Sequence, residues 1–208
     1  MNVLKKIESE LKKYYVDKSI SNVNAKRVGW KNEMAQEIRF EQLFRSFKLV
    51  DGDSIIDLGC GLGDLYQYLI KINQDINLSY FGVDLLEEMI FEAKKRHINA
   101  SFEQIDTISS IKNSDYIVAS GIFNLKHNAF EDEWLEYIHE TISIMYNKSN
   151  KGVSFNCLTL FCDKEFIREE LYYCDPIKLF EFCMKNISNN VSIYHDYKQF
   201  DFTISITK

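Results

Sequence analysis

Proline and glycine are scarce in this sequence of 208 residues, which has one proline, Pro176, and eight glycines. Collagen-like and low-complexity chains are rich in both residues, so those classes are excluded. No internal repeat and no linker-like stretch divides the chain. With 46% hydrophobic and 27% charged residues, the composition is that of a globular protein. We therefore expect a single domain over residues 1–208.

Long apolar runs are also absent. No stretch of eighteen consecutive apolar residues is present, so we expect no membrane-spanning helix and no membrane partner. The start of the chain, Met1–Lys6, leads into an amphipathic pattern and lacks the apolar core of a signal peptide. The sequence therefore predicts a cytoplasmic protein.

Cysteine pairs with the spacing of a metal site are missing. The five cysteines are an odd number, and no two have the C-x-x-C spacing. Neither a disulfide framework nor a zinc site is indicated, and we predict no metal.

Basic residues are fewer than acidic ones, which gives a net charge of −6, but the charges are unevenly distributed along the chain. Residues 1–50 carry eleven Lys or Arg against six Asp or Glu, whereas residues 51–208 carry fourteen against twenty-five. A nucleic-acid-binding surface needs a basic footprint. The acidic body therefore argues against a nucleic-acid partner, and the basic first segment keeps RNA open as an alternative.

What the chain does have is a glycine-rich stretch, Ile55–Leu65, around which the rest is organised. A short apolar run ends in Asp57, passes through three glycines at alternate positions and opens into a helical pattern. This predicts a strand, a tight turn and a helix N-terminus whose N–H groups face a ligand. The spacing is not the G-x-G-x-x-G of dinucleotide sites. Because the Asp57 carboxylate suits an ammonium group and would repel a pyrophosphate, a nicotinamide cofactor is disfavoured.

The same stretch resembles motif I of the class I S-adenosylmethionine (SAM) dependent methyltransferases. The resemblance covers about residues 50–160. It implies a Rossmann-like α/β fold, in which a seven-stranded, mostly parallel sheet has one antiparallel C-terminal strand. It also implies SAM as the cofactor and S-adenosylhomocysteine (SAH) as the product. The cofactor contacts that it implies here are Asp57, Gly59, Cys60, Gly61 and Gly63. The alternative is a glycine-rich turn that binds nothing.

A second strand, Ser79–Val83, leads into another acid, Asp84. An acid at this point of a βαβ unit accepts hydrogen bonds from the two ribose hydroxyls of an adenosine. Leu85 and Met89 would then lie near the adenine. In the family, an acid placed like Asp106 often accepts from the adenine amino group. The alternative role of Asp84 is an N-cap for the following helix.

A third stretch, Asp115–Asn124, resembles motif IV of the same family. It reads as a buried strand with a small-residue exit, and the resemblance assigns Ser120, Gly121 and Ile122 to the cofactor and Asn124 to the acceptor. It lacks the Asn-Pro-Pro-Tyr type of motif, which speaks against N-methylation of a base or an amide.

The remaining pattern alternates strands and helices, which predicts an α/β sheet with right-handed crossovers. The resemblance implies that residues 1–50 form an N-terminal helical lid on a core of residues 51–208. Predicted helices cover residues 3–16, 31–47, 64–73, 86–96, 131–146 and 176–186. Predicted strands cover residues 54–57, 79–83, 101–106, 116–119, 152–158, 191–195 and 200–207.

The lid contains three residues that are unusual on a surface helix, Trp30, Gln36 and Arg39. Gln36 and Arg39 are three positions apart and share a helix face. Arg39 could pair with the carboxylate of SAM. The alternative is that Arg39 pairs with a neighbouring glutamate and that Trp30 packs on the core.

Methylation of a hydroxyl benefits from a general base. The candidates are His127, just past the motif IV segment, His195 and Asp175. The alternative for His127 is a solvated loop histidine. Asn156, Arg168, Tyr172 and Tyr173 would line the acceptor site, or else serve only in packing.

Two further segments, Phe155–Thr159 and Leu171–Pro176, resemble bacterial methyltransferases of surface-polysaccharide biosynthesis. This implies O-methylation of a sugar or a sugar-linked group. The alternatives are an RNA methyltransferase and a SAM-binding partner subunit without turnover.

Overall fold

The computed structural model describes residues 2–21, 33–73 and 75–208, and within them the chain forms a seven-stranded sheet with the order β3-β2-β1-β4-β5-β7-β6. The pairs β1–β2, β1–β4, β2–β3 and β4–β5 are parallel, whereas β7 runs antiparallel to both β5 and β6. The strands are β1 (Ser54–Leu58), β2 (Ser79–Asp84), β3 (Ser101–Gln104), β4 (Ser114–Ala119), β5 (Ser149–Leu158), β6 (Val191–Tyr194) and β7 (Asp201–Thr207). The predicted fold class is confirmed.

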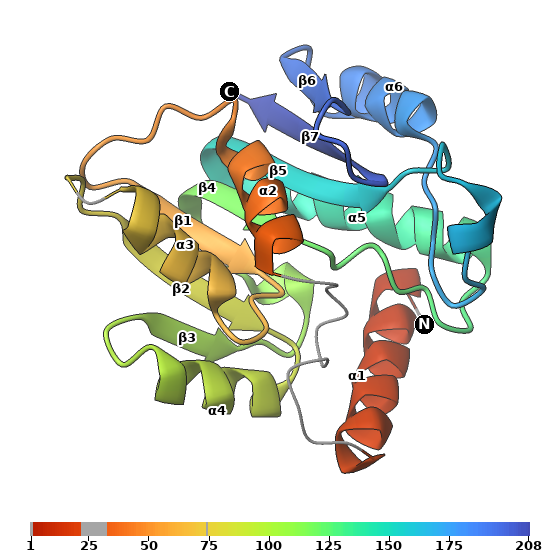
Figure 1. The fold of residues 1–208 in the computed structure, drawn as a ribbon, viewed down its shortest axis with the longest axis horizontal. Helices are drawn as coiled ribbons and strands as arrows, with labels where there is room; N and C mark the ends of the chain where they lie inside the picture. Colours follow the sequence, from red (N-terminus) through yellow and green to blue (C-terminus); the bar gives the residue numbers. More distant parts are fainter. Residues whose placement is uncertain (1, 22–32, 74) are drawn as a thin grey trace.

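Helices cover both faces of the sheet, which gives three layers (Figure 1). One core cluster joins α2, α3 and α4 to the sheet, and a second joins α1, α5 and α6 to its other face. Consecutive residues of a strand point to opposite faces, so Ile55 belongs to the first cluster and Ile56 to the second. The helices are α1 (Val3–Ser21), α2 (Glu33–Phe44), α3 (Asp64–Ile72), α4 (Glu87–Arg96), α5 (Glu131–Lys148) and α6 (Pro176–Asn186).

The element boundaries differ from the predicted ones mainly near the N-terminus. Helix α1 extends to Ser21, past the predicted end at residue 16, although residues 17–21 carry no continuous apolar stripe. Helix α2 ends at Phe44 because the next residues form tight turns, in which the Phe47 N–H donates to the Phe44 carbonyl. No helix in the described ranges has the length and apolar character needed to cross a bilayer.

Candidate active site

The glycine loop connects β1 to α3 and is held in left-handed backbone conformations. Gly59, Gly61 and Gly63 have φ values of 74°, 52° and 81°. A Cβ added at Gly59 would lie 2.3 Å from the Cγ2 atom of Ile122, which follows β4. Glycine is therefore required at Gly59 both by the backbone and by the close approach of the β4 exit.

Asp84, at the end of β2, lies beside this loop. Its carboxylate accepts the Gly61 N–H at 3.0 Å and the Leu86 N–H at 3.0 Å. Burial raises the pKa of Asp84, and these backbone N–H groups partly oppose the rise. The N-cap of α4 is Leu86 rather than Asp84. Asp84 thus ties the loop to β2 and presents its carboxyl group to a cavity.

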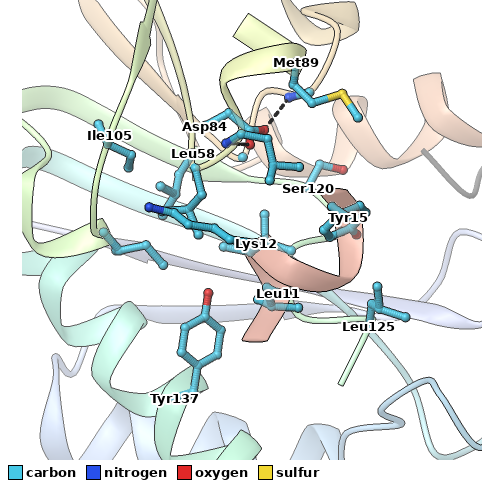
Figure 2. Close-up of a pocket in the computed structure, with 17 residues that line it drawn as sticks. Leu11, Lys12, Tyr15, Leu58, Asp84, Met89, Ile105, Ser120, Leu125 and Tyr137 are labelled. Atoms are coloured by element: carbon cyan, nitrogen blue, oxygen red, sulfur yellow. Dashed lines mark hydrogen bonds between the residues drawn. The ribbon is translucent and has the colours of Figure 1, made fainter. Parts of the chain in front are cut away.

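The cavity has a volume of about 140 Å³ and lies at the carboxyl ends of β1, β2 and β4 (Figure 2). This is the edge at which open α/β sheets bind their ligands. Eight predicted cofactor residues line it: Gly59, Gly61, Asp84, Leu85, Met89, Ser120, Gly121 and Ile122. Lining residues that were not predicted are Leu11, Lys12, Tyr15, Leu58, Leu86, Ile105, Ile108, Leu125 and Tyr137.

Helix α1 covers one side of the cavity, and its residues account for three of the missed positions. The Glu8 carboxylate accepts the Ile108 N–H at 2.7 Å and the Thr107 hydroxyl at 3.1 Å. One turn later, the Lys12 ammonium donates to the Asp106 carbonyl at 2.8 Å. The two side chains hold α1 on the segment that follows β3. The apolar stripe of α1 predicts that the helix packs, but not on which surface.

Asp57 lies behind the glycine loop rather than in the cavity lining. It is 3% exposed and accepts a hydrogen bond from the Tyr80 hydroxyl at 2.7 Å. Burial raises the pKa of Asp57 to about 7, although the Tyr80 hydrogen bond opposes the rise. Cys60 is also buried, and its N–H donates to the Val83 carbonyl at 3.1 Å. Both residues support the loop from behind.

The other predicted cofactor contacts lie elsewhere. The Asp106 side chain is exposed and does not line the cavity. Gln36 donates to Asp64, at the first turn of α3, at 3.2 Å. Arg39 forms a buried ion pair with Asp201 of β7 and does not line the cavity. Trp30 lies outside the described residues.

None of the three candidate bases lines the cavity. His127 follows Leu125 by two residues, has a φ of 49° and packs against Tyr14, with ring centroids 4.4 Å apart. His195 is exposed and lies edge-on to the Phe161 ring. Asp175 caps α6 by accepting the N–H groups of the residues two and three positions after it. The Asp175 carboxylate therefore has a structural role as the N-cap of α6.

The predicted acceptor residues separate into two groups. Asn156 is completely buried, and its amide binds Ser120 and Gly121. The Asn124 side chain accepts the Leu158 N–H at 3.2 Å, so both asparagines position the β4 exit.

The second group belongs to the connection between β5 and α6. The Tyr173 hydroxyl donates to the Phe166 carbonyl at 3.0 Å and accepts the Arg168 N–H at 3.2 Å. Tyr172 packs against the core, while the Arg168 side chain is exposed. These residues shape the connection and do not line the cavity.

A set of metal ligands is absent from the part of the chain that the structure describes. No group of three His, Cys, Asp or Glu side chains there is arranged to hold a metal ion.

The fold and the cavity together define a Rossmann-like methyltransferase architecture. The magnesium protoporphyrin IX methyltransferase of Synechocystis PCC 6803 with bound SAH superposes with a TM-score of 0.65 at 14% identity, covering 97% of this chain and 99% of that chain. A SAM-dependent methyltransferase from Aquifex aeolicus gives a TM-score of 0.57 at 14% identity, covering 89% and 99%. Human N-acetylserotonin methyltransferase with SAM gives 0.60 at 12% identity, covering 84% and 54%. At these identities the likeness concerns the fold.

The sequence comparisons establish the family. A family model described as "Methyltransferase domain" matches residues 49–154, just over half of the chain. The Mycobacterium tuberculosis protein named "Putative methyltransferase Rv1506c" is 38% identical over 167 residues, which cover 79% of this chain and 98% of the relative. The chain belongs to the class I SAM-dependent methyltransferases, and SAM is the cofactor that this class uses.

Proposed function

We propose that this protein binds SAM in the cavity of Figure 2 and methylates an oxygen atom of a small polar acceptor. The leading candidate for the acceptor is a sugar or sugar-linked group of a bacterial surface polysaccharide. The observation that carries the proposal is the cavity itself, which brings the glycine loop, Asp84 and the β4 exit together under α1.

The residues present fit SAM in three respects. The glycine loop has no Cβ atoms at Gly59 and Gly61, so a ligand can approach its backbone. The Asp84 carboxyl group can accept hydrogen bonds from the ribose hydroxyls. The apolar side chains of Leu85, Ile105 and Ile122 can flank an adenine ring.

When bound, SAM supplies a methyl group on a sulfonium, which is the electrophile of the reaction. The chain must then hold the acceptor oxygen close to and in line with the methyl carbon. The new bond joins the acceptor oxygen to the methyl carbon as the sulfur–methyl bond breaks, and the hydroxyl proton passes to a base. Of the three candidate bases we propose His127, because it follows the cavity residue Leu125 by two residues; it lines a separate surface hollow of about 520 Å³, so the acceptor would have to extend from the cavity towards this hollow.

The surroundings of His127 suit a polar acceptor. The hollow brings the rings of Tyr14 and Phe130 together with the side chains of Asn128 and Glu133. Aromatic faces can cover the C–H surface of a sugar, while amide and carboxylate groups can bind its hydroxyls. Helix α1 covers one side of the cavity, which supports a small acceptor and a lid role for the N-terminal segment. Structural neighbours include enzymes named for small acceptors such as N-acetylserotonin.

The basic charge of the N-terminal segment has a structural explanation that weakens the RNA alternative. Among the described residues, its cations pair with acids of the rest of the chain in three ion pairs: Lys6–Glu133, Arg39–Asp201 and Arg45–Asp196. Those pairs connect the lid to the body of the protein and leave less positive charge for phosphates.

The test uses methyl-labelled SAM, purified protein and a host extract divided into small-molecule, polysaccharide and RNA fractions. Label in the small-molecule or polysaccharide fraction is the expected result, and label in RNA alone would overturn the proposal. SAM binding without transfer to any fraction would indicate a partner subunit without turnover. A His127→Asn variant should bind SAM normally and lose turnover.

A further inference from the structure

The resemblance to the methyltransferase family predicts that Asp106 contacts the adenine, but the cavity lacks this acid. Asp106 is exposed, its side chain is absent from the lining, and its carbonyl oxygen is occupied by the Lys12 ammonium. The polar edge of a buried adenine would still need hydrogen-bond partners, because an unpaired polar group in an apolar site is costly.

Most polar side chains of the cavity are already engaged. Both oxygens of Asp84 accept backbone N–H groups, Lys12 donates to a carbonyl, and the Ser120 hydroxyl accepts from the Asn156 amide. Tyr15 and Tyr137 are the two remaining hydroxyl-bearing residues in the lining. Burial raises the pKa of Tyr15 to about 12, and the charge of Asp84 adds to the rise.

Tyr137 lies at the end of the cavity opposite Asp84 (Figure 2). It comes from α5, on the side of the cavity away from Asp84, and its hydroxyl points into the cavity (Figure 2). It is 2% exposed. Burial raises the pKa of Tyr137, so the hydroxyl stays protonated and can both donate and accept a hydrogen bond. The apolar side chains of Leu11 and Ile108 also line this cavity.

We propose that the Tyr137 hydroxyl binds the polar edge of the adenine ring and thereby contributes to the affinity for SAM. The argument rests on the proposed placement of SAM. If Asp84 holds the ribose, the adenine must continue into the apolar part of the cavity. A hydroxyl that can donate and accept suits an edge that carries both a ring nitrogen acceptor and an amino donor.

Calorimetric titration with SAH and with 5′-methylthioadenosine tests this role. The second ligand keeps the adenine and the ribose but lacks the amino acid. Tyr137→Phe should lower the affinity for both ligands by the same factor, about tenfold, because one buried hydrogen bond is lost in each complex. The melting temperature of the ligand-free variant reports whether the fold is intact.

Ser143→Ala is the control. Ser143 also lies on α5, is half-buried, donates to the His139 carbonyl at 2.8 Å and does not line the cavity. This variant should bind both ligands like the unsubstituted protein. An equal loss in both variants would overturn the proposal, since the effect would then come from the packing of α5.

Two further outcomes separate this inference from the proposed function. Unchanged affinity of Tyr137→Phe for 5′-methylthioadenosine, with SAH still bound by the unsubstituted protein, would overturn the role of Tyr137 alone. Failure of the unsubstituted protein to bind SAH would overturn both the placement of SAM and the role of Tyr137.

Discussion

Asn156 on β5 holds Gly121 at the exit of β4: its Oδ1 atom accepts the Gly121 N–H at 2.9 Å. Its Nδ2 atom donates to the Ser120 hydroxyl at 3.1 Å, so both ends of the amide are used. Gly121 has a φ of 81°, and both Ser120 and Gly121 line the cavity. The completely buried Asn156 side chain thereby fixes the part of the cavity wall that follows the neighbouring strand β4.

We expect Asn156→Leu to weaken SAM binding about tenfold and to lower the free energy of unfolding by about 1–3 kcal/mol, because it leaves the partly buried Gly121 N–H without its partner. Calorimetry and urea unfolding measure the two effects. Ser154→Ala, on the same strand, is the control, since Ser154 is also completely buried but bonds to Ser205. It should cost stability without changing SAM affinity. Normal SAM binding by Asn156→Leu would contradict the positioning role.

Asp84→Ala should weaken SAM binding by about ten- to a hundredfold, because it removes a charged acceptor of the ribose hydroxyls. The carboxylate also accepts the Gly61 N–H, so part of the effect comes from the glycine loop. Asp84→Asn retains one acceptor oxygen and should have a smaller effect. Glu92→Ala, on α4, is the control, since Glu92 pairs with Lys95 and lies outside the cavity lining. Unchanged affinity in Asp84→Ala would remove the ribose assignment.

Asp57 should make the stability of the protein depend on pH. Its folded pKa of about 7 lies above the ordinary value of about 3.9, so the folded state binds more protons than the unfolded state between these values. The contribution of Asp57 therefore becomes increasingly destabilising as pH rises from about 4 to 7, and is constant above that range. Asp57→Asn should be more stabilising at pH 8 than at pH 5 in urea unfolding.

The control for this pH effect is Asp115→Asn. Hydrogen bonds from Ser54 hold the pKa of Asp115 below its ordinary value, so both its folded and unfolded pKa values lie below pH 5. Its effect on stability should be destabilising and the same at pH 5 and pH 8. A stability difference for Asp57→Asn that does not change with pH would show that the buried carboxyl group does not titrate in this range.

Arg39→Ala should destabilise the fold by about 3–5 kcal/mol, because it leaves the Asp201 carboxylate buried without its cationic partner. Arg45→Ala is the matched comparison on the neighbouring turn. The side chains of the Arg39–Asp201 pair are 10% and 0% exposed, whereas those of Arg45–Asp196 are 43% and 65% exposed. The exposed pair should contribute less than about 1 kcal/mol.

A second variant separates the structural role of Arg39 from a role in binding the SAM carboxylate. Replacing both partners, Arg39→Met with Asp201→Leu, removes the buried charges together and should recover most of the lost stability. If this double variant is stable and binds SAM normally, the pair is structural. Weak SAM binding by a stable double variant would support the cofactor role instead.

The sheet and the glycine loop could be predicted because their signals are local. Alternating apolar residues, the acids Asp57 and Asp84, and glycines at fixed spacing lie within short stretches of sequence. The resemblance led us to expect an N-terminal helical lid, but the residues of α1 that line the cavity could not be predicted in this way. Their position depends on contacts such as Glu8 to Ile108, between residues a hundred positions apart, and the stripe of a helix does not name its partner.

The polar residues after the strands were harder still. Asn156 and Arg39 were both expected to contact ligands, Asn156 because it lies near the carboxyl end of β5 and Arg39 because it is an unusual residue on a lid helix. Each is instead engaged by a partner that the sequence does not indicate, Gly121 in one case and Asp201 in the other. Whether such a group points into the cavity or behind its wall is decided by tertiary packing, which periodicity does not encode.

The position of β7 in the sheet has a consequence for the growing chain on the ribosome. It pairs with β5 from Gly152↔Thr207 to Leu158↔Asp201, and β6 has its sheet partner in β7. Until residues 201–207 emerge, the ten-residue strand β5 presents an unpaired edge that carries apolar side chains such as Phe155. A protein chain that ends before Asp201 would therefore form an aggregation-prone folding intermediate, in which the exposed edge of β5 can pair with that of another chain, and would not form a shorter enzyme.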